Sequence, residues 1–264
     1  MQDKTRLEDA LELMRDLRER CEWDRAQTHE SLRPYLIEEA HELDDALRAG
    51  DVRQMREELG DVLLQVLFHS VIAEESGAFD AGGVAEALIE KMKRRHPHLY
   101  GGGEREPWET IKARTRVSIA DGLPAGLPSL HRAQRLQDRA AGVGFDWNDT
   151  EGPARKVEEE LGEVRELLPA AERERERERE GGATPAGAVG SALEGELGDL
   201  LFAVVNLCRR AGVHASLALD RANDKFARRF ERVEQLAAER GVVMGEADLA
   251  TLDDLWDEVK AGER

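Results

Sequence analysis

The chain of 264 residues is poor in the residues that build disulfide scaffolds, cysteine-based zinc sites and β-sheets. Its two cysteines, Cys21 and Cys208, lie far apart in the sequence, which excludes a disulfide framework and a zinc-finger pattern. Aromatic residues make up 5% of the chain, and no long alternating apolar–polar run predicts a strand. No apolar stretch approaches the roughly 18 residues that a membrane helix needs, and the N-terminal residues have no signal-peptide core. We therefore expect a cytoplasmic protein without a membrane partner.

Basic residues are outnumbered, since 38 Lys and Arg face 56 Asp and Glu, for a net charge of −18. This balance argues against a protein that coats nucleic acid, because phosphate backbones are bound by Lys and Arg. Apolar residues make up 41% of the chain, and Ala, Leu, Glu and Arg are abundant. Such a composition favours an all-α protein with real hydrophobic cores.

Apolar residues recur at helical spacing along most of the chain. They predict helices at about 5–20, 34–50, 51–77, 84–95, 108–118, 129–141 and 215–239, and a short one within 246–262. One further helix is expected to begin at 153, and another to include 193–205. Pro34 is expected in the first turn of its helix, and Asp51 is expected as the N-cap of the next one. Residues 21–31 and 142–150 are expected to be loops.

An acidic pattern occurs twice, each time within apolar helical sequence. Glu38-Glu39-x-x-Glu42 precedes Glu58-x-x-Asp61, and the second half repeats it as Glu159-Glu160-x-x-Glu163 and Glu196-x-x-Asp199. The offset between copies is 121 residues (39 to 160) for the first element and 138 residues (58 to 196) for the second, so the second half holds 17 extra residues. The extra residues correspond to a Glu/Arg and Gly-rich insertion at 172–190, expected to be a frayed helical extension followed by a flexible linker. This arrangement predicts two helical domains, 1–120 and 129–264, joined by a Pro/Gly-rich linker at 121–128.

The acids within each element are three residues apart and therefore share a helix face. If two such helices pack side by side, four carboxylates converge, and such a group must take up protons or hold a cation. Oxygen ligands suit Mg²⁺, or Mn²⁺ as a substitute. One acidic pair alone would more often be a solvated helix face, but the repetition favours a metal site in each half. The candidate ligands are Glu39, Glu42, Glu58 and Asp61, and Glu160, Glu163, Glu196 and Asp199.

A rival interpretation is a di-iron bundle, because Glu38-x-x-His41 has the Glu-x-x-His spacing of those proteins. The motif occurs once, and Gly162 stands at the equivalent position of the second half. His41 is therefore expected to be an ordinary helix residue.

A basic cluster at i, i+3, i+4 spacing also occurs twice, and it suggests an anionic ligand opposite the metal or ordinary salt bridges. Its members are Lys91, Arg94 and Arg95, and Lys225, Arg228 and Arg229. Asn223 adds a polar side chain in the second half alone, since Ile89 is its counterpart. Trp147 and Trp256 are candidates for stacking on a base, although either could simply be a core residue.

Several further motifs accompany the acidic pattern in the same order along nearly the whole chain. They are Trp23-Asp24-x-x-Gln27-Thr28, Arg94-Arg95-His96-Pro97-His98, Gly144-Phe145-Asp146-Trp147, Gly198-Asp199-Leu200-Leu201-Phe202 and Asn223-x-Lys225-Phe226-x-Arg228-Arg229-Phe230. With Glu-Glu-x-x-Glu and Glu-x-x-Asp, these motifs resemble the MazG family of all-α nucleoside triphosphate pyrophosphohydrolases, in a tandem of two four-helix-bundle-type domains.

This resemblance implies Mg²⁺-dependent hydrolysis between the α and β phosphates of nucleoside triphosphates, broad in base specificity and serving to clean the nucleotide pool. It also implies a homodimer, and it makes the eight acids named above the metal ligands. Glu38, Glu159 and Glu160 become the candidates for catalysis. Lys225, Arg228, Arg229, Asn223, Trp147, Lys91 and Arg95 become the candidates for substrate binding. The second half is expected to be the principal catalyst.

Two other functions remain open at this point. One is a more selective enzyme, such as a dUTP or phosphoribosyl-ATP pyrophosphohydrolase. The other is a non-catalytic regulatory protein built on the same bundle, which loss of the acids would favour, and no acid is lost. A P-loop enzyme is not expected, because the chain has no Walker-type glycine-rich loop.

Overall fold

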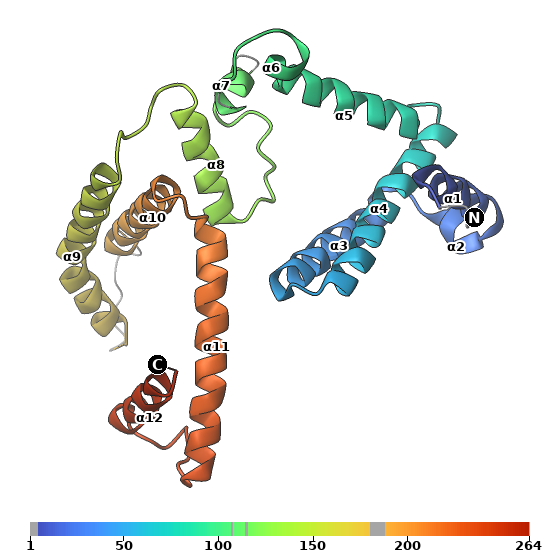
Figure 1. The fold of residues 1–264 in the computed structure, drawn as a ribbon. Helices are drawn as coiled ribbons and strands as arrows, with labels where there is room; N and C mark the ends of the chain where they lie inside the picture. The colour runs from blue at the N-terminus through green and yellow to red at the C-terminus, as the bar shows by residue number, and fades with distance from the viewer. Residues whose placement is uncertain (1–4, 107, 114–115, 180–187, 264) are drawn as a thin grey trace. The chain divides into compact units, whose positions relative to one another are not determined.

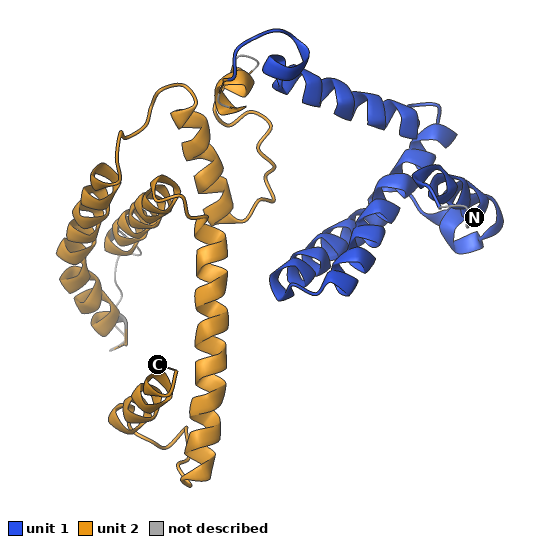
Figure 2. Cartoon of the chain, viewed as in Figure 1, with its two compact units in different colours: residues 1–105 blue, residues 106–264 orange. Residues whose placement is uncertain are grey.

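The computed structural model describes residues 5–106, 108–113, 116–179 and 188–263 of the chain. Every regular element in these residues is a helix (Figure 1). The predicted all-α class is therefore confirmed. The chain divides into two compact units, residues 1–105 and 106–264 (Figure 2), which we describe one at a time.

The first unit is organised around its longest helix, α4. Its helices are α1 (Leu7–Arg20), α2 (Glu22–Ala26), α3 (His29–Ala49), α4 (Val52–Glu75), α5 (Ala81–Arg95) and α6 (Pro97–Tyr100). Helix α4 contacts α1, α3 and α5. The core of the unit, at the C-terminal half of α4, consists of Met14, Leu32, Phe68 and Val71, each no more than 3% exposed.

A tight turn joins α3 to α4 and makes the two helices antiparallel neighbours. Gly50 ends α3 in the left-handed conformation with φ of 70°, which suits glycine because it has no Cβ. Asp51 begins α4 as predicted, since its side chain accepts hydrogen bonds from the backbone N–H groups of Arg53 and Gln54. The short connection sets the acids of α3 beside those of α4.

The expected loop at 21–31 is wrong in detail. It contains the short helix α2, and α3 begins at His29, five residues before Pro34. The reason is a capping box, in which Thr28 accepts from the backbone N–H of Ser31 and Ser31 accepts from that of Thr28. Pro34 consequently lies inside α3 rather than in its first turn, and it is exposed.

The second unit is organised around α10. Its helices are α7 (Trp108–Ala113), α8 (Ser129–Ala141), α9 (Glu151–Arg179), α10 (Ala188–Arg210), α11 (Ala215–Glu239) and α12 (Leu249–Ala261). Helix α10 contacts α8, α9 and α11, and α11 also contacts α8 and α12. One core cluster joins α9 to α10 through Val164, Ala171 and Leu193. A separate cluster around Val233 and Leu255 holds α12 against the end of α11.

The boundary between the units lies between residues 105 and 106, before the linker expected at 121–128. Helix α7 packs on α8, because Glu109 binds Arg135 at 2.8 Å and Arg116 at 3.0 Å. Helix α7 approaches the end of α8 closely, since a Cβ on Gly142 would lie 2.9 Å from the Cβ of Glu109. Residues 121–128 therefore form a loop inside the second unit.

The charged insertion is partly visible. Helix α9 continues through the Glu/Arg run to Arg179, as the predicted helical extension requires, and α10 begins at Ala188. The rest of the expected linker, residues 180–187, lies outside the described residues.

Among the residues described, no single helix is long and apolar enough to cross a membrane. One bent pair, Val189–Arg210 with Ala215–Glu239, passes the same test of length and composition when the two helices are taken together.

Candidate metal centre

The first acid cluster lies between α3 and α4. One carboxylate oxygen each from Glu39, Glu42 and Glu58 lies within 4.8 Å of the others. Asp61 is outside this set of three, but its charge, after burial, is the next cause that raises the pKa of Glu39. The predicted convergence of acids from two helices is thus present, and His41 is exposed and not part of it.

The second acid cluster lies between α9 and α10 and is more buried than the first. Oxygens of Glu160, Glu196 and Asp199 lie within 4.8 Å of one another, and Glu160 is only 5% exposed. Glu163 is outside the set of three, although its carboxyl group forms a hydrogen bond with that of Glu196. This hydrogen bond, burial and the charge of Glu160 raise the pKa of Glu163. Carboxyl groups held this close to one another indicate more negative charge than the protein itself neutralises.

A lysine that the sequence interpretation overlooked neutralises part of this charge. Lys156 lies one turn before the acids on α9, and its ammonium group is 2.8 Å from Glu159 and 2.6 Å from Glu160. Hydrogen bonds to these two carboxylates raise the pKa of Lys156. The i, i+4 spacing of Lys156 and Glu160 was the available signal. Because Tyr35 stands 121 residues earlier, the first cluster has no equivalent lysine.

These donor sets fit a hard divalent cation. All the converging atoms are carboxylate oxygens, which Mg²⁺ and Mn²⁺ prefer, and no Cys or His belongs to either described cluster. Burial is the main cause that raises the pKa of Glu39, and the hydrogen bond with Glu196 is the main cause for Glu163. The charges of neighbouring acids add to both shifts, and a cation would relieve that repulsion.

The predicted substrate-binding cations are not brought to the acids within the described part of one chain. Helix α5, with Lys91 and Arg95, contacts α4 and α6, and α11 has no contact with α9. Lys225 and Arg228 line a hollow on α11. Arg229 instead binds Glu263 at 2.6 Å, and its guanidinium lies 6.0 Å from the ring centroid of Trp256.

The remaining candidates of both units lie at or near the surface of the protein. Asn223 is exposed on α11, and Trp147 is 44% exposed in the loop before α9. Glu159 and Glu38 are also exposed, each beside the acid that points into its cluster.

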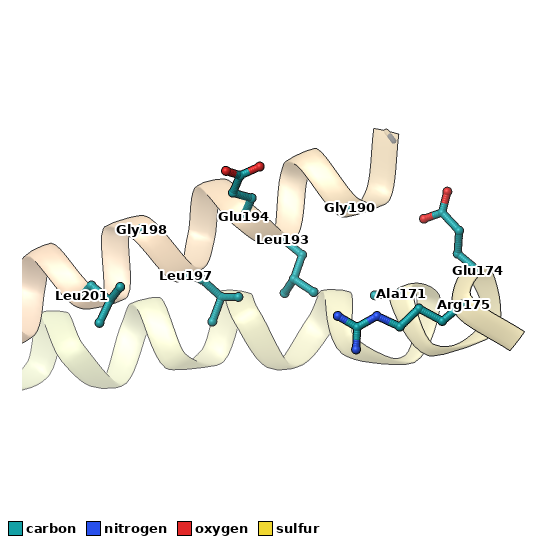
Figure 3. Close-up of a pocket in the computed structure, with 9 residues that line it drawn as sticks. All are labelled: Ala171, Glu174, Arg175, Gly190, Leu193, Glu194, Leu197, Gly198 and Leu201. Carbon is teal, nitrogen blue, oxygen red and sulfur yellow. The ribbon is translucent and has the colours of Figure 1, made fainter. Parts of the chain in front are cut away.

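A hollow of about 600 Å³ lies between the end of α9 and the start of α10 (Figure 3). Leu193, Leu197 and Leu201 form an apolar strip along α10, and Arg175 of the charged extension reaches toward it (Figure 3). Leu197 is 41% and Leu201 58% exposed. An apolar strip left open beside buried acids is typical of a surface that another element covers.

Comparison with known proteins agrees with the division into two similar helical units. The MazG nucleotide pyrophosphohydrolase domain matches residues 27–100 and 151–234, one segment in each unit. A Thermotoga maritima protein named nucleoside triphosphate pyrophosphohydrolase/pyrophosphatase MazG is 43% identical, over 97% of this chain and 96% of its own length. The nucleoside triphosphate pyrophosphohydrolase of Escherichia coli K12 is 39% identical, over 98% and 97%. The uncharacterised protein YabN of Bacillus subtilis is 40% identical, over 92% of this chain and 49% of its own length.

Two all-helical repeats, each with an oxygen-only acid cluster between antiparallel helices, define a tandem α-helical protein with a candidate divalent-cation centre in each half. Both repeats match the same domain, and the similarity to the first two relatives extends over nearly the whole chain. The chain belongs to the MazG nucleotide pyrophosphohydrolase family.

Proposed function

We propose that the chain hydrolyses nucleoside triphosphates to nucleoside monophosphate and pyrophosphate in a reaction that depends on Mg²⁺, with Mn²⁺ as a substitute. The observation that carries this proposal is the cluster of Glu160, Glu196 and Asp199, whose oxygens lie within 4.8 Å of one another. Broad base specificity and a role in removing unwanted nucleotides from the pool are part of the proposal. The partner is a free nucleotide rather than a nucleic acid, which the net charge of −18 favours.

Glu160, Glu196 and Asp199 would hold the cation in the second unit, with Glu163 beside them, and Glu39, Glu42, Glu58 and Asp61 are the corresponding residues of the first. When bound there, Mg²⁺ supplies charge neutralisation for the phosphates and lowers the pKa of water. Helices α9 and α10 hold these carboxylates in place before substrate arrives, so little reorganisation is required.

The reaction transfers a phosphoryl group to water and needs no covalent intermediate with the protein. The oxygen of water forms a bond to the α-phosphorus, and the bond between that phosphorus and the bridging α–β oxygen breaks. Pyrophosphate leaves with the electron pair, and a carboxylate accepts the proton of the water. Glu159 suits this last role, because it is 58% exposed and adjoins Glu160. Glu38 has the same place in the first unit.

The second unit is the better candidate for the principal catalyst. Its cluster is more buried, which strengthens electrostatic interactions with phosphate, and Lys156 adds a cation that the first cluster lacks. These differences support a stronger interaction with an anionic substrate in this unit.

A homodimer is the second part of the proposal. On α3 of the first unit, Tyr35, Leu36 and Ile37 are 36–59% exposed, and on α10 of the second Leu197 and Leu201 are open. Large apolar side chains in adjacent positions on long helices favour burial against another copy of the chain. A second copy could also supply cations that α11 does not bring to α9 within one described chain.

The proposal is tested by incubating the protein with Mg²⁺ and each of the common ribo- and deoxynucleoside triphosphates. We expect one pyrophosphate for each monophosphate, and no activity in the presence of EDTA. Release of orthophosphate in place of pyrophosphate would contradict the reaction, and activity that survives EDTA would contradict the metal. Sedimentation of the same sample tests the dimer separately.

A further inference from the structure

Two histidines of the first unit join α3 to α4 at the end of the helix pair that lies away from the acid cluster. His29 is the first residue of α3, and His69 lies in the last two turns of α4. Their Nδ1 atoms are 2.8 Å apart, and we call the pair the histidine clasp. We propose that the histidine clasp is a pH-sensitive contact, which holds the start of α3 on α4 near neutral pH and releases it in acid. This inference goes beyond the proposed function and does not depend on it.

The geometry of the clasp is that of a hydrogen bond between two rings in nearly one plane. The ring planes differ by 13° while the centroids are 5.1 Å apart, so the rings meet edge to edge through their Nδ1 atoms. One Nδ1 must therefore donate a proton and the other must accept it. Two neutral rings satisfy this condition, and so does a pair with one positive charge. When both rings are protonated, each Nδ1 carries a proton, and repulsion between two charges replaces the hydrogen bond.

The surroundings of His69 oppose a second positive charge. Its side chain is half-buried, and burial, followed by the charge of His29, lowers its pKa. The helices that contact α4 are α1, α3 and α5, and His29 is the one charged group on them that shifts this pKa. Glu86 and Glu90 of α5 are not among the causes. The other charged side chains near the clasp on α1, α3 and α4 form ion pairs with one another, namely Arg15–Glu74, Arg18–Glu75 and Glu30–Arg33.

The clasp lies at the open end of the hairpin that α3 and α4 form (Figure 1). The turn at Gly50 and Asp51 closes the other end of this hairpin. Leu32, which is 1% exposed in the first core, comes three residues after His29. The clasp therefore extends the attached part of α3 by nearly one turn, to the first residue of the helix. Opening the clasp would free this turn, while Leu32 keeps the rest of α3 on the core.

The second unit has no equivalent of the clasp. At the offsets of 121 and 138, Thr150 corresponds to His29 and Leu207 to His69. The second unit does contain a histidine pair, His131 and His214, whose ring centroids are also 5.1 Å apart. Those rings are perpendicular, at 89°, and the buried Nδ1 of His214 has no hydrogen-bond partner among the described residues. Release in acid is therefore expected at the start of α3 and not at the start of α9.

The direction of the pH effect follows from the number of protons that each state binds. The closed clasp accepts at most one added proton, whereas two free histidines each bind one below their ordinary pKa of about 6.5. The open state takes up one proton more than the closed state, so acid favours opening. Between about pH 6.5 and pH 5 the equilibrium constant for opening should rise about tenfold.

Amide hydrogen exchange between about pH 7.5 and pH 5 would test the clasp, with each rate expressed as a protection factor that removes the intrinsic effect of pH. In the unchanged chain we expect protection of residues 32–37 to fall about tenfold between about pH 6.5 and pH 5. In His29→Ala, protection there should already be about fivefold lower near pH 7.5, because one hydrogen bond is lost. It should then change less than about twofold as the pH falls.

His41→Ala removes an exposed histidine from the same helix and is the matched control, which should keep the pH response of the unchanged chain. His69→Phe retains a ring without nitrogen and should lose the pH response as His29→Ala does. Protection at the start of α9 should follow the same course in all variants. If protection of residues 32–37 did not fall in acid in the unchanged chain, or fell by the same factor in His29→Ala, the clasp would not be a pH-sensitive contact.

Discussion

The two units place the same acid motif on antiparallel helices, but they differ in what lies at the other end of those helices. In the first unit α4 continues into a packed core around Phe68, and in the second the C-terminal half of α10 lines an apolar cavity of about 560 Å³. The acid clusters differ in the same direction, because Glu39 is partly exposed whereas Glu160 is buried and paired with Lys156. At the positions of Phe68 and Val71, the second unit has the polar residues Asn206 and Arg209, which line this cavity.

Two copies of a repeat can therefore share a fold and a set of carboxylates and still differ in their cores and cavities. A core that has no buried aromatic residue at the position of Phe68 is weaker, so the second unit needs stabilising contacts elsewhere. The second unit has additional clusters that do this, such as the ion pairs of Glu109 on α7 and the core between α11 and α12.

The largest expected effect follows from removing the core of the first unit. Phe68→Ala should lower the free energy of unfolding of that unit by about 3–5 kcal/mol, because Phe68 is 2% exposed and packs on Met14, Leu32 and Val71. Amide hydrogen exchange in α1, α3 and α4 would measure the loss. Val66→Ala, at a 44% exposed position of the same helix, is the control and should change little. If exchange increased equally in α9 and α10, the two units would not be independently stable.

The next effect separates the two acid clusters. Glu160→Gln removes a charge from the buried cluster, and we expect pyrophosphate release to fall roughly a hundredfold. The matched change Glu39→Gln should reduce it less than about threefold if the second unit is the principal catalyst. Initial rates at saturating Mg²⁺ would measure both. Equal losses in the two variants would instead show that both units work at similar rates.

A third effect concerns the ion pairs that tie α7 to α8. Burial raises the pKa of Glu109, but hydrogen bonds from Arg135 and Arg116 outweigh it and lower that pKa from 4.5 to about 2. Because the folded-state pKa is depressed, Glu109 stabilises the second unit above about pH 4.5, and this contribution is lost as the pH falls toward 2. The lowered pKa corresponds to a contribution of about 3 kcal/mol at most to the free energy of unfolding. We expect about 2 kcal/mol, because the Glu109 side chain keeps some exposure to solvent.

Urea unfolding of Glu109→Gln and of the unchanged chain, between pH 2 and pH 7, would measure this contribution. The difference in free energy of unfolding should be constant above about pH 5 and shrink below pH 4.5. Glu234→Gln, at an exposed site on α11, should show no such difference. A difference that persisted unchanged at pH 2 would mean that the Glu109 charge is not its source.

The helices and the convergence of the acids could be predicted because both depend on local spacing. Asp51 as an N-cap, Gly50 as a helix end and the Glu39 and Glu58 faces follow from residue type and a period of 3.6. The predicted start of α3 at Pro34 is wrong because the capping box of Thr28 and Ser31 satisfies backbone N–H groups earlier in the chain and begins the helix there.

The cavity between α8, the loop before α9 and α10 could not be predicted in this way, because three segments distant in the sequence form it. Gln137 lies on α8, Trp147 in a loop and Asn206 on α10, and only tertiary packing brings them together. One signal was nevertheless present in the sequence. At the repeat offset an apolar Phe68 and Val71 become Asn206 and Arg209 within an otherwise apolar helix, which a packed core would not tolerate without compensation.

The smallest effect concerns the short turn that aligns the acids of the first unit. Asp51 caps α4 through the backbone N–H groups of Arg53 and Gln54, so Asp51→Ala should cost about 1 kcal/mol of unfolding free energy. Asp51→Asn keeps an acceptor for these hydrogen bonds, and it should lower the free energy of unfolding by only a few tenths of a kcal/mol. Thermal unfolding of the two variants side by side would distinguish them. If Asn were as destabilising as Ala, the charge of Asp51 near the N-terminus of α4, rather than its hydrogen bonds, would be what stabilises the turn.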